Sequence, residues 1–184
     1  MGSVTDLKIT TPPTGLANDA SESKAPAPGL YTPEQRARRD ASKWTLVQGI
    51  LAPVQFVVFL ISLGLVIRFL LTGEGYAAAT VSVMVKTLVL YAIMVTGAIW
   101  EREVYGCYLF APAFFWEDVF SMLVLALHTA YLLCIGLGWL TLEQQMWLAL
   151  AAYAAYIINA GQFLIKFRQA RLAAAASNGD PGLK

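Results

Sequence analysis

The sequence predicts an all-α, polytopic membrane protein, with four transmembrane helices in a bundle and a short N-terminal interfacial helix. The composition favours this class, because 58% of the 184 residues are hydrophobic and only 14% are charged, an apolar share above that of soluble domains. Length supports it, since four apolar segments reach the roughly 20 residues that a helix needs to cross a bilayer. These segments are expected at about residues 44–71, 77–100, 117–137 and 144–165.

The two ends of the chain are predicted to lie outside the membrane domain. Residues 1–29 are rich in Pro, Ser, Thr, Ala and Gly, a composition that predicts a disordered N-terminal tail. The membrane domain is expected over residues 30–171, and residues 172–184 are expected to form a C-terminal tail. The interfacial helix should begin near Thr32, a good N-cap residue that Gln35 extends into a capping box.

Positive charge is placed unevenly along the chain, which predicts how it sits in the membrane. Basic residues precede the first span and follow the fourth, whereas the connectors at residues 72–76 and 138–143 contain no Lys or Arg. By the positive-inside rule both termini are then cytoplasmic. The longer connector between the second and third spans is expected on that side too. The flanking basic residues are Arg36, Arg38, Arg39, Lys43, Lys166, Arg168 and Arg171.

The connector region from Trp100 to Asp118 is the most informative part of the sequence. It carries five ionisable side chains and seven aromatic ones. Carboxyl groups beside flat apolar side chains at a membrane boundary suit acid–base chemistry on a flat, apolar substrate. A helix N-terminus favours negative charge and would by itself explain two of the acids, Glu117 and Asp118. It does not explain Glu101 and Glu103.

Polar residues inside the expected spans are costly and usually face the interior of a bundle. In the first span, Gln48, Gln55 and Ser62 recur every seven residues and therefore share one face. A second stripe in the third span consists of Glu117, Ser121, Val124, His128 and Tyr131. Lys86 lies near the middle of the second span, and polar residues of the fourth include Tyr153, Tyr156, Asn159 and Gln162.

Each of these polar residues also has a purely structural interpretation. Amide and hydroxyl side chains often only join neighbouring helices, and Lys86 could neutralise an acidic partner or extend toward an interface. His128, the single histidine, could be structural, a magnesium ligand or a proton-transfer group. One histidine cannot supply both axial ligands of a bis-His haem, which disfavours a b-type cytochrome within one chain.

Several long runs resemble the 3-vinyl bacteriochlorophyllide hydratases, over about residues 30–170. The runs are Tyr31-Thr-Pro-Glu-Gln-Arg-Ala-Arg-Arg-Asp40, Trp44-Thr-Leu-Val-Gln-Gly-Ile-Leu-Ala-Pro53, Val95-Thr-Gly-Ala-Ile-Trp-Glu-Arg-Glu-Val104, Tyr108-Leu-Phe-Ala-Pro-Ala-Phe-Phe-Trp-Glu-Asp118 and Ala126-Leu-His-Thr-Ala-Tyr131. The resemblance implies a hydro-lyase of bacteriochlorophyll biosynthesis in phototrophic bacteria. Such enzymes add water across the C3 vinyl group of a chlorophyllide or bacteriochlorophyllide and form the 3-(1-hydroxyethyl) product.

The resemblance also implies partners, a cofactor requirement and a location. No cofactor is expected, because magnesium is part of the substrate. The expected partners are the pigment substrate and the lipid bilayer, with self-association or other enzymes of the pathway as further candidates and no nucleic acid. The expected location is the inner, photosynthetic membrane of a bacterium. Chlorophyllide a and its 3-vinyl bacteriochlorophyllide counterpart are both compatible with these expectations.

Four carboxyl residues are the candidate catalytic groups. Hydration to the secondary alcohol suggests protonation of the terminal vinyl carbon first, followed by addition of water beside the ring. We expect Glu101 or Glu117 to be the acid, and Asp118 or Glu103 to orient the water.

Candidate substrate-binding residues surround these acids in the sequence. His128 is expected as a proton relay or as an axial ligand to the substrate's magnesium. The substrate's propionate would suit Arg36, Arg39, Arg102 or Lys166. Lys86 is a further candidate for substrate binding. Aromatic residues that could cover the macrocycle are Trp100, Phe110, Phe114, Phe115 and Trp116.

Two other functions compete with a hydratase. A non-catalytic pigment-binding or assembly protein would need a ligand and apolar surface but no pair of acids. A small transporter or proton channel could use Lys86, Glu101 and His128, and it would act without pigment. The surplus of carboxyl groups beside the aromatic connector favours the enzyme.

Overall fold

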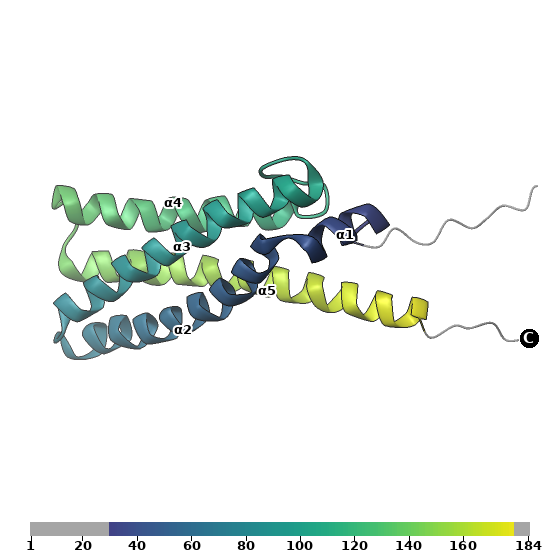
Figure 1. The fold of residues 1–184 in the computed structure, drawn as a ribbon. Helices are drawn as coiled ribbons and strands as arrows, with labels where there is room; N and C mark the ends of the chain where they lie inside the picture. Colours follow the sequence, from purple (N-terminus) through teal and green to yellow (C-terminus); the bar gives the residue numbers. More distant parts are fainter. Residues whose placement is uncertain (1–29, 179–184) are drawn as a thin grey trace, which may run out of the picture.

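The computed structural model describes the backbone of residues 30–178 and the side chains of residues 30–172. Helices account for all of the regular structure in that range, so the predicted fold class is confirmed (Figure 1). The predicted N-terminal tail and the last residues of the chain lie outside the described residues. The helices are α1 Pro33–Ala41, α2 Lys43–Thr72, α3 Tyr76–Tyr105, α4 Phe115–Leu137 and α5 Leu142–Asn178.

Four of these helices, α2 to α5, are long and apolar enough to cross a membrane, as predicted. Two extend well past their expected ends, because no Gly or Pro interrupts them there. Helix α3 continues past residue 100 to Tyr105, so Glu101 and Glu103 lie on a helix and not in a connector. Helix α5 continues past residue 165 to Asn178, into the region expected to be a tail.

The bundle consists of two helical hairpins: α2 packs along α3, and α4 packs along α5. Glycines in the left-handed conformation end the first helix of each hairpin, at Gly73 (φ 73°) and Gly138 (φ 65°). An L-residue with a side chain rarely adopts this conformation. Both turns lie at one end of the bundle, and α1, the α3–α4 loop and the C-terminal part of α5 lie at the other (Figure 1).

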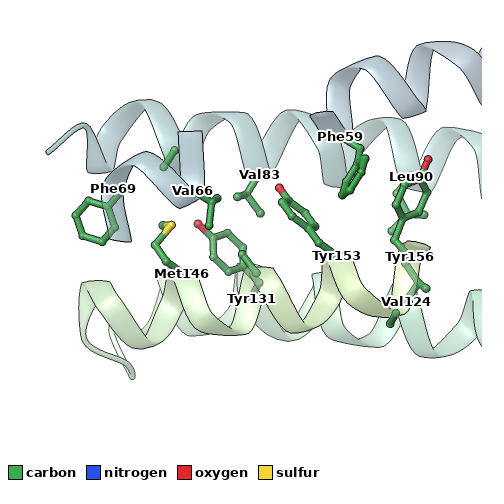
Figure 2. Close-up of a cluster of buried hydrophobic side chains, with 13 residues drawn as sticks. Phe59, Val66, Phe69, Val83, Leu90, Val124, Tyr131, Met146, Tyr153 and Tyr156 are labelled. Carbon is green, nitrogen blue, oxygen red and sulfur yellow. The ribbon is translucent and has the colours of Figure 1, made fainter. Parts of the chain in front are cut away.

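Aromatic side chains from α2 and α5 fill much of the interior (Figure 2). The ring of Phe59 lies edge-on to that of Tyr153, with centroids 5.4 Å apart, and 4.9 Å from that of Tyr156. Polar contacts join α2 to α5 and also to α3, since Ser62 Oγ lies 2.5 Å from the Tyr153 hydroxyl of α5 and 2.7 Å from Ser82 Oγ of α3. In an apolar solvent such bonds and close packing hold helices together, at about 1 kcal/mol per bond.

The predicted polar faces point inward. In α2, Gln55 and Ser62 are buried, and Gln48 donates to Thr96 Oγ1 of α3 over 2.7 Å. The whole predicted stripe of α4 is buried, together with Asp118. Helical periodicity therefore identified the interior faces of both helices correctly.

Helix α1 packs against the C-terminal end of α3. Its predicted capping box, between Thr32 and Gln35, is present. The ring of Tyr31 stacks on that of Tyr105 at 5.9 Å, beneath the guanidinium of Arg39. Burial raises the pKa of the Tyr31 phenol, which keeps it neutral as a packing and hydrogen-bonding group. At the α1–α2 junction, Ser42 Oγ donates to Glu103 Oε2 over 2.5 Å.

Candidate functional site

The loop between α3 and α4, residues 106–114, has an unusual backbone. Gly106 ends α3 in the left-handed conformation at φ 87°. Phe110 adopts φ 61° and is the one non-glycine residue with positive φ in the described range. This conformation is disfavoured for a bulky residue and is often found where a site depends on it. It turns two consecutive peptide N–H groups toward acidic side chains.

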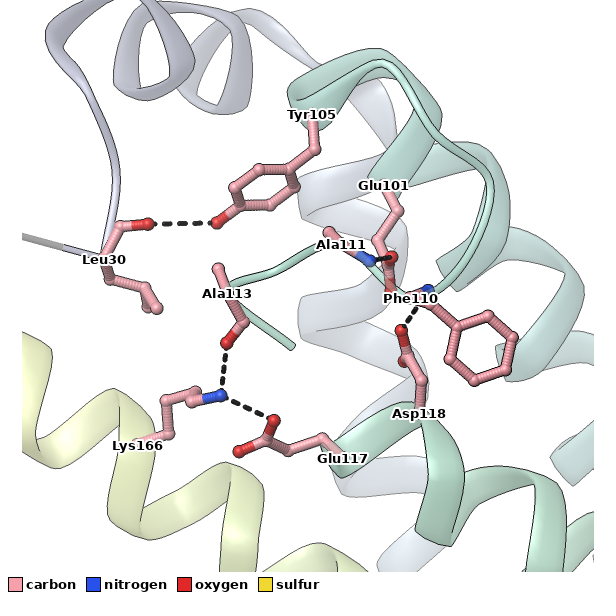
Figure 3. A network of polar contacts seen from close by, with 9 residues as sticks. All are labelled: Leu30, Glu101, Tyr105, Phe110, Ala111, Ala113, Glu117, Asp118 and Lys166. Carbon is pink, nitrogen blue, oxygen red and sulfur yellow. Dashed lines mark hydrogen bonds and ion pairs between the residues drawn. The ribbon is translucent and has the colours of Figure 1, made fainter. Parts of the chain in front are cut away.

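Those two N–H groups hold two carboxyl groups next to each other (Figure 3). The N–H of Phe110 donates to Asp118 Oδ2 over 2.7 Å, and the N–H of Ala111 donates to Glu101 Oε2 over 3.3 Å. Because their donors are consecutive residues of the loop, the carboxyl groups of Glu101 and Asp118 lie close to each other. We call them the carboxyl pair. Their residues are 6% and 3% exposed, so water reaches them only at the edge.

Such a pair can both give and take a proton. Two adjacent carboxylates with little access to water repel each other, and this favours a state in which the pair shares one proton. The protonated member is then a general acid, and the ionised member is a general base. The two backbone N–H donors hold both carboxyl groups in place without bringing a positive charge to the pair.

Glu117 lies next to Asp118 in the sequence but faces a different partner. Its Oε2 lies 2.5 Å from Lys166 Nζ of α5, and the same ammonium group donates to the carbonyl oxygen of Ala113 (Figure 3). Glu117 is buried, so this ion pair neutralises its charge. The contact ties the start of α4 and the end of the loop to α5.

Glu103 is the predicted catalytic residue that the structure does not bring to the others. It is exposed and accepts the bond from Ser42 at the α1–α2 junction. Successive residues of a helix point in different directions, which separates Glu103 from Glu101 two residues before it. Its observed contact is structural.

The predicted aromatic residues divide into two groups. Phe114 is buried, and its ring packs against those of Trp100, Tyr105 and Phe163, with centroids 5.8, 5.8 and 5.9 Å away. Trp100 also donates its indole N–H to Thr45 Oγ1 over 2.9 Å. The side chains of Trp100 and Phe114 therefore pack inside this end of the bundle.

The second group forms an exposed surface, which we call the aromatic patch: Tyr108, Phe110, Phe115 and Trp116. The rings of Phe110 and Phe115 lie 5.7 Å apart, and those of Phe115 and Trp116 lie 5.5 Å apart. The exposed Arg102 packs its guanidinium over Tyr108 at 4.6 Å. Since the backbone of Phe110 contacts Asp118, the aromatic patch adjoins the carboxyl pair.

Lys86 and His128 lie elsewhere, in the middle of the bundle, and both are 0% exposed. Lys86 Nζ lies 3.8 Å from the centroid of the Tyr156 ring. His128 is 11 residues after Glu117 on the same helix, which corresponds to about 16 Å along the axis. The structure does not bring these two residues to the carboxyl pair.

Some parts of the site gave little signal in the sequence. The sequence made Lys166 a candidate for binding the substrate's propionate. Its ion pair with Glu117 could not be predicted, because it depends on how α4 and α5 pair. Tyr105 packs between the loop and α1, and its hydroxyl donates to the carbonyl of Leu30 over 3.3 Å. The backbone conformation of Phe110 has no sequence signature, since glycine would be the usual choice there.

Together the fold and the site define a small helical membrane protein with a buried acid pair beside an exposed aromatic surface. The chain belongs to the 2-vinyl bacteriochlorophyllide hydratase family, whose model matches residues 31–169. The 2-vinyl bacteriochlorophyllide hydratase of Cereibacter sphaeroides is 70% identical over 148 residues, covering 80% of this chain and 92% of the relative. That of Rhodobacter capsulatus is 68% identical over 149 residues, covering 81% and 86%. No solved structure matches the chain.

This membership confirms the family that the sequence resembled, although the two names number the vinyl-bearing ring position differently. It makes the chain an enzyme of the hydro-lyase class. A non-catalytic pigment carrier and a transporter are therefore not needed to explain the acidic residues.

Proposed function

We propose that this hydratase adds water to the vinyl group of a chlorophyllide or bacteriochlorophyllide at the carboxyl pair, Glu101 and Asp118. The observation that carries the proposal is the pair of consecutive N–H groups, from Phe110 and Ala111, that hold two buried carboxyls side by side. This arrangement lies next to the exposed aromatic patch, in a chain whose relatives are named as hydratases of such a pigment.

The reaction needs one proton donor and one proton acceptor. The protonated carboxyl gives its proton to the terminal CH₂ carbon, and the positive charge that is delocalised into the macrocycle develops on the other vinyl carbon, the one attached to the ring. A water oxygen then bonds to that carbon, and the water's proton passes to the ionised carboxylate. One proton enters the product and one returns to the pair, so the enzyme regains its starting state. The negative charge of the pair stabilises the cation in between.

The two members of the carboxyl pair fit this chemistry better than the other predicted acids. Glu117 is bound to Lys166, and an ion-paired carboxylate is a poor proton donor. We assign Glu117 a positioning role, because it fixes the start of the helix that carries Asp118. Either Glu101 or Asp118 can start as the acid, since the exchange of one proton between them interchanges their roles.

The aromatic patch is the surface that we propose for the macrocycle. Flat aromatic side chains bury a flat apolar ligand effectively, and Phe115 and Trp116 are exposed beside the site. Arg102 is exposed, and no carboxylate among the described side chains lies within ion-pair distance of it. Its guanidinium contacts the ring and hydroxyl of Tyr108, and its remaining N–H donors could bind the substrate's propionate. The pigment would then approach from the lipid along the outer surface of the bundle.

We further propose that the end of the bundle that carries the site faces the cytoplasm of a photosynthetic bacterium's inner membrane. The asymmetric placement of Lys and Arg supports this orientation, with both termini cytoplasmic. No separate cofactor is proposed, and magnesium arrives as part of the substrate. The prediction that His128 is its axial ligand requires the bundle to open, because this side chain is fully buried. Association with a second copy or with other enzymes of the pathway also stays a prediction.

The test is a membrane assay of Asp118→Asn and Glu101→Gln with chlorophyllide a. Chromatography and mass spectrometry would measure the product that is heavier by one water. Loss of a positioned acid or base should lower kcat by about 10²- to 10⁴-fold while pigment still binds. Glu103→Gln is the matched control and should keep near-normal turnover. Full activity in both pair variants would exclude this site, and full loss in Glu103→Gln would move the chemistry to the α1–α2 junction.

A further inference from the structure

The interior of the bundle contains polar atoms that the protein leaves without partners. Among the described side chains, all eight buried atoms without a hydrogen-bond partner belong to α2, α3, α4 or α5. They are Gln55 Nε2 and Oε1, Thr80 Oγ1, Lys86 Nζ, His128 Nε2, Tyr131 OH, Asn159 Oδ1 and Gln162 Oε1. An unpaired buried polar group is costly, and lipid tails offer it nothing. The concentration of such atoms in one interior calls for a ligand.

The unpartnered ammonium group of Lys86 carries the largest free-energy cost among these atoms. Its ammonium group lies over the ring of Tyr156 at 3.8 Å and 6.0 Å from that of Tyr153. Ring faces attract a cation, but they do not replace the acceptors that three N–H donors require. No carboxylate among the described side chains lies within ion-pair distance. Lys86 therefore presents unused donors to the interior.

His128 presents an unused acceptor to the same interior. Its Nδ1 lies 2.8 Å from the carbonyl oxygen of Val124, and a carbonyl oxygen only accepts. Nδ1 therefore carries the hydrogen, and Nε2 of the neutral ring has a free lone pair. The imidazole lies 5.8 Å from the Tyr153 ring, and Lys86 Nζ lies 6.0 Å from the same ring. A donor and an acceptor thus lie near each other without a direct bond.

Only one class of small ligand satisfies both. An anion would accept from Lys86 but would be repelled by the lone pair of His128 Nε2. A metal ion would suit the lone pair of His128 but would be repelled by the ammonium. Water donates and accepts, and buried waters are found where two to four polar groups are otherwise unsatisfied. We propose that the bundle interior binds ordered water that bridges Lys86 and His128.

The water has a polar continuation toward the site end of the bundle. Asn159 donates from Nδ2 to Ser121 Oγ over 2.8 Å, while its Oδ1 has no protein partner. Ser121 is buried on α4, three residues after Asp118 and so about one helical turn away. Water at Asn159 Oδ1 would bring internal water to within about one helical turn of Asp118.

The test uses the full-length protein in lipid nanodiscs without pigment, so its outcome does not depend on the proposed function. Infrared difference spectra between H₂¹⁶O and H₂¹⁸O identify O–H stretching bands that belong to water, and comparison of the wild type with each variant separates the internal water from the bulk. The wild type should show such bands, and Lys86→Met and His128→Phe should each lose or shift them. Met84→Leu, on the exposed face of α3, is the matched control and should leave them unchanged. Absence of the bands in the wild type, or identical bands in all variants, would overturn the proposal.

Thermal unfolding provides an independent readout. Each single variant leaves one partner unsatisfied and should lower Tm, whereas the double variant should lose less than the sum of the two. Strict additivity would mean that the residues share no water. Replacing chloride by gluconate should leave the wild-type Tm unchanged, and a chloride dependence that Lys86→Met removes would identify an anion site instead. Loss of pigment affinity in His128→Phe, with unchanged water bands, would return His128 to the role of magnesium ligand.

Discussion

The molecule has two buried polar regions, and they are satisfied in different ways. At the site end, the carboxyl pair receives backbone N–H donors from its own loop, and Glu117 receives Lys166. In the middle of the bundle, Lys86 and His128 Nε2 find no protein partner in the described range. Acids at the end are thus held in place by the fold itself, whereas the central groups need something the chain does not supply. The groups of the first region are bonded to other protein groups, and those of the second bind water under the proposal above.

The largest expected effect on this comparison comes from breaking the ion pair at the site end. Lys166→Met leaves Glu117 buried without its partner, and removal of one member of a buried pair costs about 3–5 kcal/mol. Partial exposure of Lys166 reduces this figure to about 1–3 kcal/mol. Thermal unfolding in detergent would measure the loss. The double variant Lys166→Met with Glu117→Gln should recover part of it, and no recovery would show that Lys166 acts through Ala113.

Glu117→Gln alone separates positioning from chemistry. An amide can still accept a hydrogen bond from Lys166, so the fold should persist while turnover falls moderately through the displaced start of α4. The expected fall in kcat is smaller than that of Asp118→Asn, measured in the same assay. A fall as large as that of the pair variants would make Glu117 the acid, as the sequence also allowed.

A smaller effect is expected from Arg102→Gln, on the exposed side of the site. Loss of a charge-assisted bond to the substrate's propionate should raise KM by about tenfold, equivalent to about 1.4 kcal/mol, with kcat nearly unchanged. Arg102→Lys should recover part of the affinity. Kinetics with the free propionate and with its methyl ester test the cause, because the ester should make the wild type behave like the variant.

The smallest expected effect sharpens the role of the Phe110 backbone. Glycine adopts φ near 61° without strain, so Phe110→Gly should be more stable than Phe110→Ala by about 1 kcal/mol. Thermal unfolding would rank the two variants. The reverse order would mean that the loop reaches the carboxyl pair through another conformation.

Sequence periodicity predicted much of this fold, because it depends only on the chain's own pattern. The positions of Gln55, Ser62, Ser121 and His128 follow from a repeat near 3.6 residues, and all four face inward. The residue types of the site were also predictable, since four acids in one short region are rare in a membrane protein. The prediction of a capping box at the start of α1 was also correct, because this motif involves only residues that are close together in the sequence.

The arrangement within the site was not predictable, because it depends on pairing between distant segments. Lys166 meets Glu117 across 49 positions of sequence, and Ser42 meets Glu103 across 61. Nothing in the local sequence distinguishes these partners from other cations or hydroxyls of the chain. The contact between Phe110 N–H and Asp118 requires a backbone conformation that a phenylalanine seldom adopts. Sequence therefore gave the chemistry of the site but not which acids share it.

The pairing of Glu117 with Lys166 has a consequence for the synthesis and membrane insertion of the protein. Helix α4 enters the membrane before α5 has been synthesised, so a buried carboxylate near its start must wait for a cation on the last helix. Lys166 also binds the carbonyl of Ala113, at the end of the α3–α4 loop whose N–H groups hold the carboxyl pair. We therefore expect the nascent chain to carry Glu117 without its partner until Lys166 on α5 has been synthesised. The last helix thus supplies the cation that pairs with the buried Glu117.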